Sequence, residues 1–172
     1  YLASLDMEII FKEFDGLGRS RISQLINKSN QFNLTTKRYA ESEIKTFEKN
    51  PNYFTRQIRL IDCFGDNGMI SAVICEIKGE NWIIDTWLMS CRVLGRRVEV
   101  SVLNDLVNSA RDSGAKRLIG IYIPSGRNAI VGKHYEQLGF SLTSKNEDRQ
   151  TWELPLSSYD NIIVPLKVSY AV

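Results

Sequence analysis

One loop decides the fold of this chain: Met89-Ser90-Cys91-Arg92-Val93-Leu94-Gly95-Arg96-Arg97-Val98-Glu99. An apolar, strand-like run from Trp82 to Leu88 precedes it, and a helix-like run that ends near Gly114 follows it. A loop of this kind favours anion binding, because the first amide groups of a helix are free and the helix dipole is positive there. The sequence therefore predicts an anion site between this strand and this helix.

The composition indicates an ordinary globular domain. A chain of 172 residues with 43% hydrophobic residues can bury a sizeable core, and a net charge of +2 favours neither nucleic acid nor a membrane surface as a partner. Three cysteines without a C-x-x-C motif argue against a disulfide framework, and a single histidine argues against zinc, so we expect no metal. Without a signal peptide or a long apolar run, a cytoplasmic location is expected.

Hydrophobic periodicity predicts eleven elements within a single domain that spans residues 1–172. Strands are predicted at 7–13, 55–62, 69–78, 81–88, 116–123, 140–143 and 150–154, and helices at 19–28, 39–49, 98 to about 114, and 128–138. The ends, 1–6 and 155–172, carry the weakest pattern. Because the chain starts at Tyr1 and its first methionine is Met7, we expect it to be a piece of a longer protein.

The connections between these elements predict the sheet. Residues 55–62, 69–78 and 81–88 are joined by links too short for crossovers, which predicts an antiparallel meander. The first link, 63–68, contains Asn67-Gly68, a strong hairpin signal. The strand–helix–strand order from 81 to 123 predicts a parallel pair with a right-handed crossover.

A polar stretch, Asn27 to Thr36, separates the first two predicted helices. Its amide and hydroxyl side chains can satisfy backbone groups of a connection between helices. They can equally form a substrate-facing loop, in which Asn30, Gln31 and Asn33 would contact substrate.

The order β-α-α-β-β-β-α-β-α-β-β resembles the GNAT acyltransferase fold, an α/β fold with a mixed, mostly antiparallel sheet and helices on both faces. In that family an acyl-CoA pyrophosphate lies on an R/Q-x-x-G-x-G/A loop, which Arg92 and Gly95 match here, whereas Arg97 replaces the final small residue. The segment from Asn128 to Phe140 resembles the family's N-A…Y-x-x-x-G-F pattern. The resemblance implies that Asn128 contacts the pantetheine arm and that Tyr135 protonates the departing thiolate. The predicted donor-binding residues are Leu88, Ser90, Arg92, Gly95, Arg96, Arg97 and Asn128.

A closer resemblance, at residues 27–35, 62–68 and 88–96, is to the carboxy-terminal domain of FkbH-like proteins. It implies that this chain is the C-terminal part of a longer protein that also contains an HAD-like phosphatase domain. It further implies an acyl carrier protein as partner and transfer of a glyceryl unit. This chain contains no D-x-D-x-[TV] phosphatase motif. Three functions follow as hypotheses: an acyltransferase domain that uses acyl-CoA or a carrier-bound phosphopantetheine thioester, a non-catalytic docking module for the carrier, and a degenerate domain used for dimerisation.

The arginines of the loop decide between a phosphate site and a solvated helix start. Cations at a helix N-terminus oppose its dipole, so Arg92, Arg96 and Arg97 together favour a bound phosphate. Arg97 suits a single phosphate, which makes a carrier-bound phosphopantetheine as plausible a ligand as CoA.

The catalytic candidates each have a structural alternative. Tyr135 is predicted as the acid, or as a tyrosine that packs in the core. Asp85, the first choice as base, could instead form an ion pair with an arginine of the loop. Cys91 could carry an acyl group, but a buried packing role is favoured. His134, about 100° from Tyr135 on the helix, is expected at the surface, and Asp62 is expected to be a turn residue.

Overall fold

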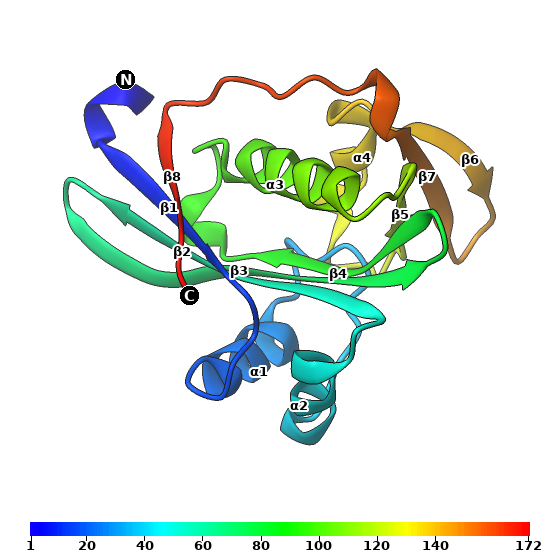
Figure 1. Ribbon diagram of the computed structural model, residues 1–172, viewed down its shortest axis with the longest axis horizontal. Coiled ribbons are helices and arrows are strands. Elements are labelled where there is room, and N and C mark those ends of the chain that lie inside the picture. The colour runs from blue at the N-terminus through cyan, green and yellow to red at the C-terminus, as the bar shows by residue number, and fades with distance from the viewer.

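An eight-stranded mixed sheet runs through the computed structural model, which describes residues 1–172 (Figure 1). The strand order is β6-β7-β5-β4-β3-β2-β1-β8. The strands are β1 (Met7–Lys12), β2 (Tyr53–Asp62), β3 (Gly65–Lys78), β4 (Asn81–Met89), β5 (Arg117–Tyr122), β6 (Ser141–Lys145), β7 (Gln150–Pro155) and β8 (Leu166–Tyr170), and the helices are α1 (Arg19–Lys28), α2 (Glu41–Lys49), α3 (Val98–Asp112) and α4 (His134–Gln137). The predicted α/β fold class is confirmed.

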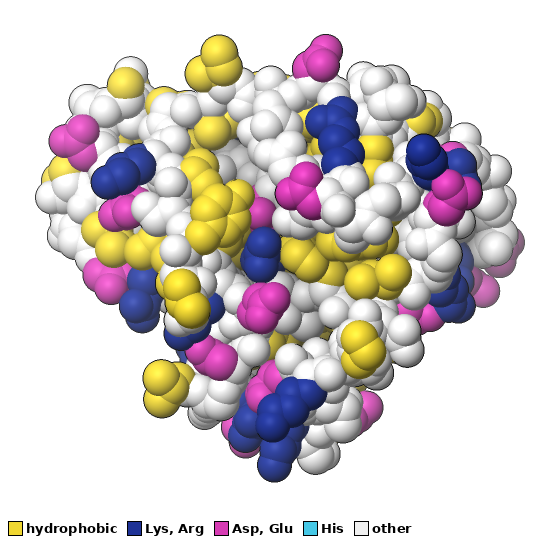
Figure 2. All heavy atoms as spheres, viewed as in Figure 1, with side chains coloured by type: hydrophobic (Ala, Val, Ile, Leu, Met, Phe, Trp, Pro, Cys, Tyr) yellow, Lys and Arg dark blue, Asp and Glu magenta, His cyan; other side chains and the backbone are white.

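Helices cover both faces of the sheet. Figure 1 shows α1 and α2 below it and α3 and α4 above it. The larger apolar core lies between the sheet and α3, with Val102 and Leu106 fully buried. A smaller core lies between the sheet and α1, with Ile22 and Ile26 fully buried. On the side of the molecule that Figure 2 displays, Lys and Arg side chains are interspersed with Asp and Glu, in line with the small net charge. No helix has both the length and the hydropathy needed to cross a membrane.

The predicted meander of β2, β3 and β4 is confirmed, and its first turn lies within the predicted link 63–68 but not at Asn67-Gly68. Asp62 pairs with Gly65, so the chain reverses at Cys63-Phe64, and Asn67-Gly68 lies inside β3. The carboxylate of Asp62 accepts a hydrogen bond from the Phe64 amide at 2.8 Å, and Gly65 takes a φ of 133°. These two features stabilise the earlier turn in place of the Asn-Gly turn.

Strands β4 and β5 are parallel, as predicted, but they pair over only part of their length. Pairing runs from Asn81 and Arg117 to Ile84 and Gly120. The next residue of β4, Asp85, is a β-bulge, because Thr86 and Ile84 pair with consecutive residues of β3. A bulge bends its strand, so β4 leaves β5 beyond this point. We call the opening between Thr86–Met89 and Ile121–Ile123 the splay.

The helix predicted at 128–138 is wrong as a continuous element. A 3-10 turn, Ala129–Val131, precedes a one-turn α4 that begins only at His134. The side chain of Asn128 bonds to other loops instead of starting a helix, and Gly132 separates the two turns. Glycine lowers helix stability in such a position.

The weakly patterned tail, Pro155 to Val172, contains an additional strand. It crosses over α3 (Figure 1), where Asn104 donates a hydrogen bond to the carbonyl of Ile162 at 2.8 Å. It then forms β8, which pairs with β1 in parallel. A five-residue, mostly exposed edge strand has too few buried positions to show a clear alternation in sequence.

Candidate functional site

The loop between β4 and α3 leaves several backbone amides free. After a 3-10 turn at Cys91–Val93, Gly95 takes a φ of 78° and Arg97 a φ of 62°. No side chain caps α3, and the amides of Gly95, Arg96 and Arg97 donate no hydrogen bond within the chain. These donors lie at the positive end of a 15-residue helix, which is the arrangement that binds phosphate oxygens.

One of the three loop arginines already has its anion inside the protein. Arg96 Nη1 lies 2.5 Å from Asp62 Oδ2, and the Asp62 side chain is only 3% exposed. Hydrogen bonds from Asn67, the Phe64 amide and Arg96 hold the pKa of Asp62 below its usual value. Asp62 is therefore more than a turn residue, because it also orients Arg96.

Arg92 and Arg97 remain exposed and have no carboxylate partner. The guanidinium of Arg92 donates to the hydroxyl of Ser90 at 3.2 Å and to the carbonyl of Asn67 at 3.3 Å. Both arginines are available to a ligand at the start of α3.

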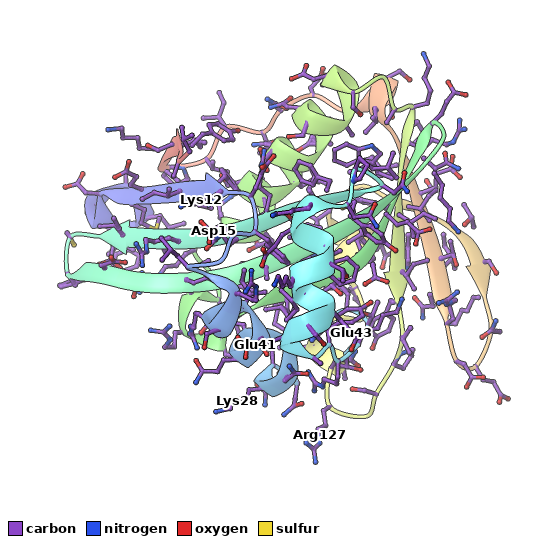
Figure 3. The ribbon with its side chains drawn as sticks, turned by 60° about the horizontal axis from the view of Figure 1, so that its bottom comes forward. Lys12, Asp15, Lys28, Glu41, Glu43 and Arg127 are labelled. Atoms are coloured by element: carbon purple, nitrogen blue, oxygen red, sulfur yellow. The ribbon has the colours of Figure 1, made fainter.

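A cleft of about 670 Å³ lies beside this loop. It is lined by Leu25, Lys28, Ser29, Asn30, Gln31, Phe32, Met89, Ser90, Cys91, Gly126 and Arg127. Its charged residues, Lys28 and Arg127, are both cationic, and Figure 3 shows them at the same edge of the molecule. The structure thus brings Asn30, Gln31, Ser90 and Cys91 together in one cleft.

Cys91 is exposed, so the favoured prediction of a buried packing residue is wrong. The 3-10 turn buries Val93 and directs Cys91 outward, where its Sγ lies 3.4 Å from Gln31 Oε1. The thiol therefore belongs to the cleft. No three His, Cys, Asp or Glu side chains gather anywhere in a metal-binding arrangement.

The segment Phe32–Leu34, from the connection between α1 and α2, fills the splay. The Leu34 amide donates to the carbonyl of Trp87 at 3.1 Å, and the Met89 amide donates to the carbonyl of Phe32 at 3.0 Å. On the other side, the amide of Ile123 donates to the carbonyl of Leu34 at 2.9 Å. The segment therefore bridges the separated ends of β4 and β5 like a short additional strand.

Asn128 lies at the same place and is fully buried. Its amide nitrogen donates to the carbonyls of Asn33, at 2.9 Å, and Ile123, at 3.0 Å, while its oxygen accepts from the Ser125 amide. Asn33 is also buried and does not line the cleft; its side-chain oxygen accepts from the Thr36 amide at 2.9 Å. Leu88 pairs with Asn33 through its backbone, and its side chain packs under α1.

Comparison with solved structures identifies this architecture. The ribosomal-protein-S18-alanine N-acetyltransferase of Escherichia coli matches with a TM-score of 0.67 at 14% identity, over 90% of this chain and 98% of its own. The spermidine N-acetyltransferase of Vibrio cholerae, in complex with CoA and spermine, matches with 0.65 at 11% identity, over 87% and 96%. A GNAT-family protein of Desulfovibrio desulfuricans matches with 0.64 at 11% identity, over 87% and 99%. This chain has the GNAT fold. No protein-family model and no curated protein matches the sequence.

Within this GNAT fold, Asp85 is bound to side chains of the α1–α2 connection. Its carboxylate lies 2.5 Å from Lys37 Nζ and accepts a hydrogen bond from the Tyr39 hydroxyl at 2.6 Å. Burial, followed by this hydrogen bond, raises the pKa of Tyr39. The ion pair that the sequence left open therefore exists, but its cation is Lys37 and not an arginine of the loop. The hydroxyl of Thr35 also donates to the Asp85 carbonyl at 2.9 Å.

An aromatic cluster lies behind the splay. The His134 ring packs against Trp87 and Phe32, with centroid distances of 4.4 and 5.3 Å, and Tyr135 packs beside it. His134 is 6% exposed, so its predicted surface position is wrong. The angle between His134 and Tyr135 around the helix does not predict the exposure of His134, because Phe32 covers the side on which His134 lies.

Three buried polar atoms of this cluster have no hydrogen-bond partner of good geometry: Trp87 Nε1, His134 Nε2 and the Tyr135 hydroxyl, which has the backbone of Ile121 as a polar neighbour. An unpaired buried polar group costs about 1–3 kcal/mol. Burial also raises the pKa of Tyr135 well above its ordinary value and lowers that of His134 to about 3. At neutral pH both side chains are uncharged.

Sequence reasoning did not find Phe32, Lys37 or Tyr39 as parts of the site. It also did not find Gly120, where an added Cβ would lie 2.6 Å from the Tyr135 ring. An isolated glycine in a strand pattern signals close approach of another group, and this signal was present in the apolar run from Leu118 to Tyr122.

The unpaired hydroxyl makes Tyr135→Phe an informative change. We expect the free energy of unfolding to stay the same or to rise by up to about 1 kcal/mol, because the substitution removes a buried group without a partner. Chemical denaturation measures this. Tyr159→Phe is the matched control, since the Tyr159 hydroxyl donates to Asn104 at 2.5 Å and its loss should destabilise by about 1 kcal/mol. A larger loss for Tyr135→Phe than for the control would show that the hydroxyl is bonded in solution.

Proposed function

We propose that this domain binds the phosphopantetheine arm of an acyl thioester and helps to transfer a small acyl group, such as a glyceryl unit. One observation carries the proposal: the uncapped start of α3 behind Gly95, with the exposed Arg92 and Arg97, neither of which has a carboxylate partner. Free amides and unpaired guanidinium groups bind phosphate oxygens. The CoA complex of the spermidine N-acetyltransferase, which shares the fold, supports a ligand that carries this arm.

The thioester could come from CoA or from an acyl carrier protein, because both carry the same arm. Arg97, in place of a small residue, favours the single phosphate of a carrier-bound arm. Carrier proteins are acidic, and the exposed cations Arg92, Arg97, Arg127 and Lys133 would suit such a partner. The amide and hydroxyl groups of Asn30, Gln31 and Ser90 in the cleft match the hydroxyls of a glyceryl unit.

Positioning would be the main contribution of the chain. The loop amides and Arg92 would hold the phosphate, and the backbone groups of β4 would orient the thioester. A phenol with a raised pKa stays protonated at neutral pH and can donate to a thiolate, which is the role proposed for Tyr135. Its hydroxyl is buried, so the role requires the cluster around it to open.

A specific observation favours the second candidate, a non-catalytic docking domain for the carrier protein. Asp85, the first choice as base, is committed to Lys37 and Tyr39, and no carboxylate lines the cleft. In that case the domain would deliver the carrier-bound acyl group to an HAD-like domain of the same polypeptide.

Arg92→Ala tests both candidates through their shared binding site. We expect CoA or holo-carrier affinity, measured by calorimetry, to fall at least about tenfold, because a charge-assisted hydrogen bond to phosphate is lost. Arg149→Ala, an exposed arginine on the β6–β7 turn, is the matched control and should bind normally.

Turnover separates the candidates. Acyl transfer from any thioester, reduced by Tyr135→Phe, would support the acyltransferase. Carrier binding that depends on Arg92, without turnover of any donor, would support docking. Binding that is absent, or that Arg92→Ala leaves unchanged, would contradict both.

A further inference from the structure

The segment Phe32–Leu34 lies where the proposed thioester arm would have to run. The loop between β4 and α3, which would bind the phosphate, begins at Ser90, directly after Met89. A pantetheine arm that extends from Gly95 along β4 therefore meets Met89 and then Trp87. The Met89 amide and the Trp87 carbonyl are the groups that bond to Phe32 and Leu34.

The chemistry of the segment also matches that of the arm. Pantetheine is an uncharged chain with two amide groups, and it would bond to a free strand edge as a peptide does. Phe32–Leu34 uses the β4 edge, the β5 edge at Ile123 and the side chain of Asn128. It thereby occupies hydrogen-bonding groups on both sides of the splay.

A second observation points to a polar occupant of the same space. His134 Nε2, Trp87 Nε1 and the Tyr135 hydroxyl are unpartnered, and all three side chains are more than nine-tenths buried. The ring of Phe32 packs on His134 and can offer it no hydrogen bond. A polar ligand in place of Phe32 would supply partners that the closed structure lacks.

The far end of the segment is held by a small set of contacts centred on Asp85. The Thr35 hydroxyl bonds to its carbonyl, and Lys37 and Tyr39 bond to its carboxylate. Because Asp85 is the bulge that turns β4 away from β5, the residue that opens the splay also fastens the segment inside it.

We infer that Phe32–Leu34 blocks the path of a phosphopantetheine arm through the splay, as an internal plug that its contacts with Asp85 hold in place. The arm enters only when this plug leaves the splay. This inference rests on the proposed function, since it concerns the same site. Asp85 is then a latch for a closed state, in which Lys37 and Tyr39 are its partners.

Amide hydrogen exchange, followed by NMR with and without saturating CoA, tests the plug. Ligand binding ordinarily slows exchange, but a displaced plug frees the Leu34 amide from the Trp87 carbonyl. We therefore expect exchange at Leu34 to accelerate at least about tenfold, while the Met89 amide stays protected by the arm.

Lys37→Met tests the latch. It removes the ion pair to Asp85 from a half-exposed position, so it should raise the open population and tighten apparent CoA affinity about fivefold. Lys78→Met is the matched control, because it breaks an exposed ion pair with Glu76 at the far end of β3 and should leave affinity unchanged.

The outcomes distinguish the two proposals. CoA binding with unchanged or slower Leu34 exchange, and equal affinity for Lys37→Met and wild type, would overturn the plug and leave the proposed function standing. No binding of CoA or of a holo-carrier protein by wild type or by Lys37→Met would overturn the proposed function, and the plug with it.

Discussion

Acidification from about pH 7.5 to about pH 5 is expected to destabilise this protein by roughly 2 kcal/mol through His134 alone. Burial lowers the pKa of His134 to about 3 in the folded state, whereas an unfolded imidazole titrates near 6.5. Below pH 6.5 the unfolded state therefore binds a proton that the folded state does not. The stability is fully present above pH 6.5 and is lost progressively as the pH falls towards 3.

Urea denaturation at a series of pH values measures this loss. His134 is the only histidine of the chain, so no other imidazole contributes. His134→Phe keeps a ring between Phe32 and Trp87 and removes the titration, and its stability should vary less between these pH values than that of wild type. If the free energy of unfolding changed with pH equally in the two proteins, His134 would be shown to be accessible to solvent.

Gly120→Ala is expected to destabilise the protein by about 2–3 kcal/mol, because it overpacks a rigid part of the core. An added Cβ would lie 2.6 Å from Cε1 of Tyr135, and Tyr135 is held between Trp87 and Phe140. The ring cannot move away without displacing these neighbours. Thermal and urea denaturation measure the effect.

Gly16→Ala is the matched control for Gly120→Ala. Its added Cβ would meet only the end of the Arg19 side chain, at 3.7 Å, so a change within about 0.5 kcal/mol is expected. In the double variant with Tyr135→Leu, part of the loss should be recovered, since the ring is gone. Equal stabilities of the two alanine variants would contradict the close packing of α4 on β5.

The sequence predicted most elements because their burial repeats along the chain. The helix at Arg19–Lys28 was predicted with its observed ends, since Ile22, Leu25 and Ile26 share one buried face. Elements held by distant partners were harder to predict. Strand β8 is stabilised by β1, more than 150 residues earlier, and α4 is shortened by bonds of Asn128 to loops that are remote in sequence.

The residues of the candidate site also fall into those predictable from local spacing and those that depend on distant segments. Arg92, Gly95 and Ser90 are close in sequence, and their spacing before a helix is enough to predict an anion loop. His134 and Cys91 were misplaced because their exposure depends on what covers them. Phe32, about 100 residues away, covers His134, whereas nothing covers Cys91.

By itself, the sequence determined the order of the elements, the central antiparallel strands and the loop with its arginines, because these follow from local periodicity and short spacing. Only the tertiary structure decided which side chains and segments surround the loop. It paired Arg96 with Asp62, joined Asp85 to Lys37 and Tyr39, and placed Phe32–Leu34 in the splay. The reason is physical: hydrogen bonds and ion pairs between distant segments depend on which groups the fold leaves unpaired, and no local pattern records them.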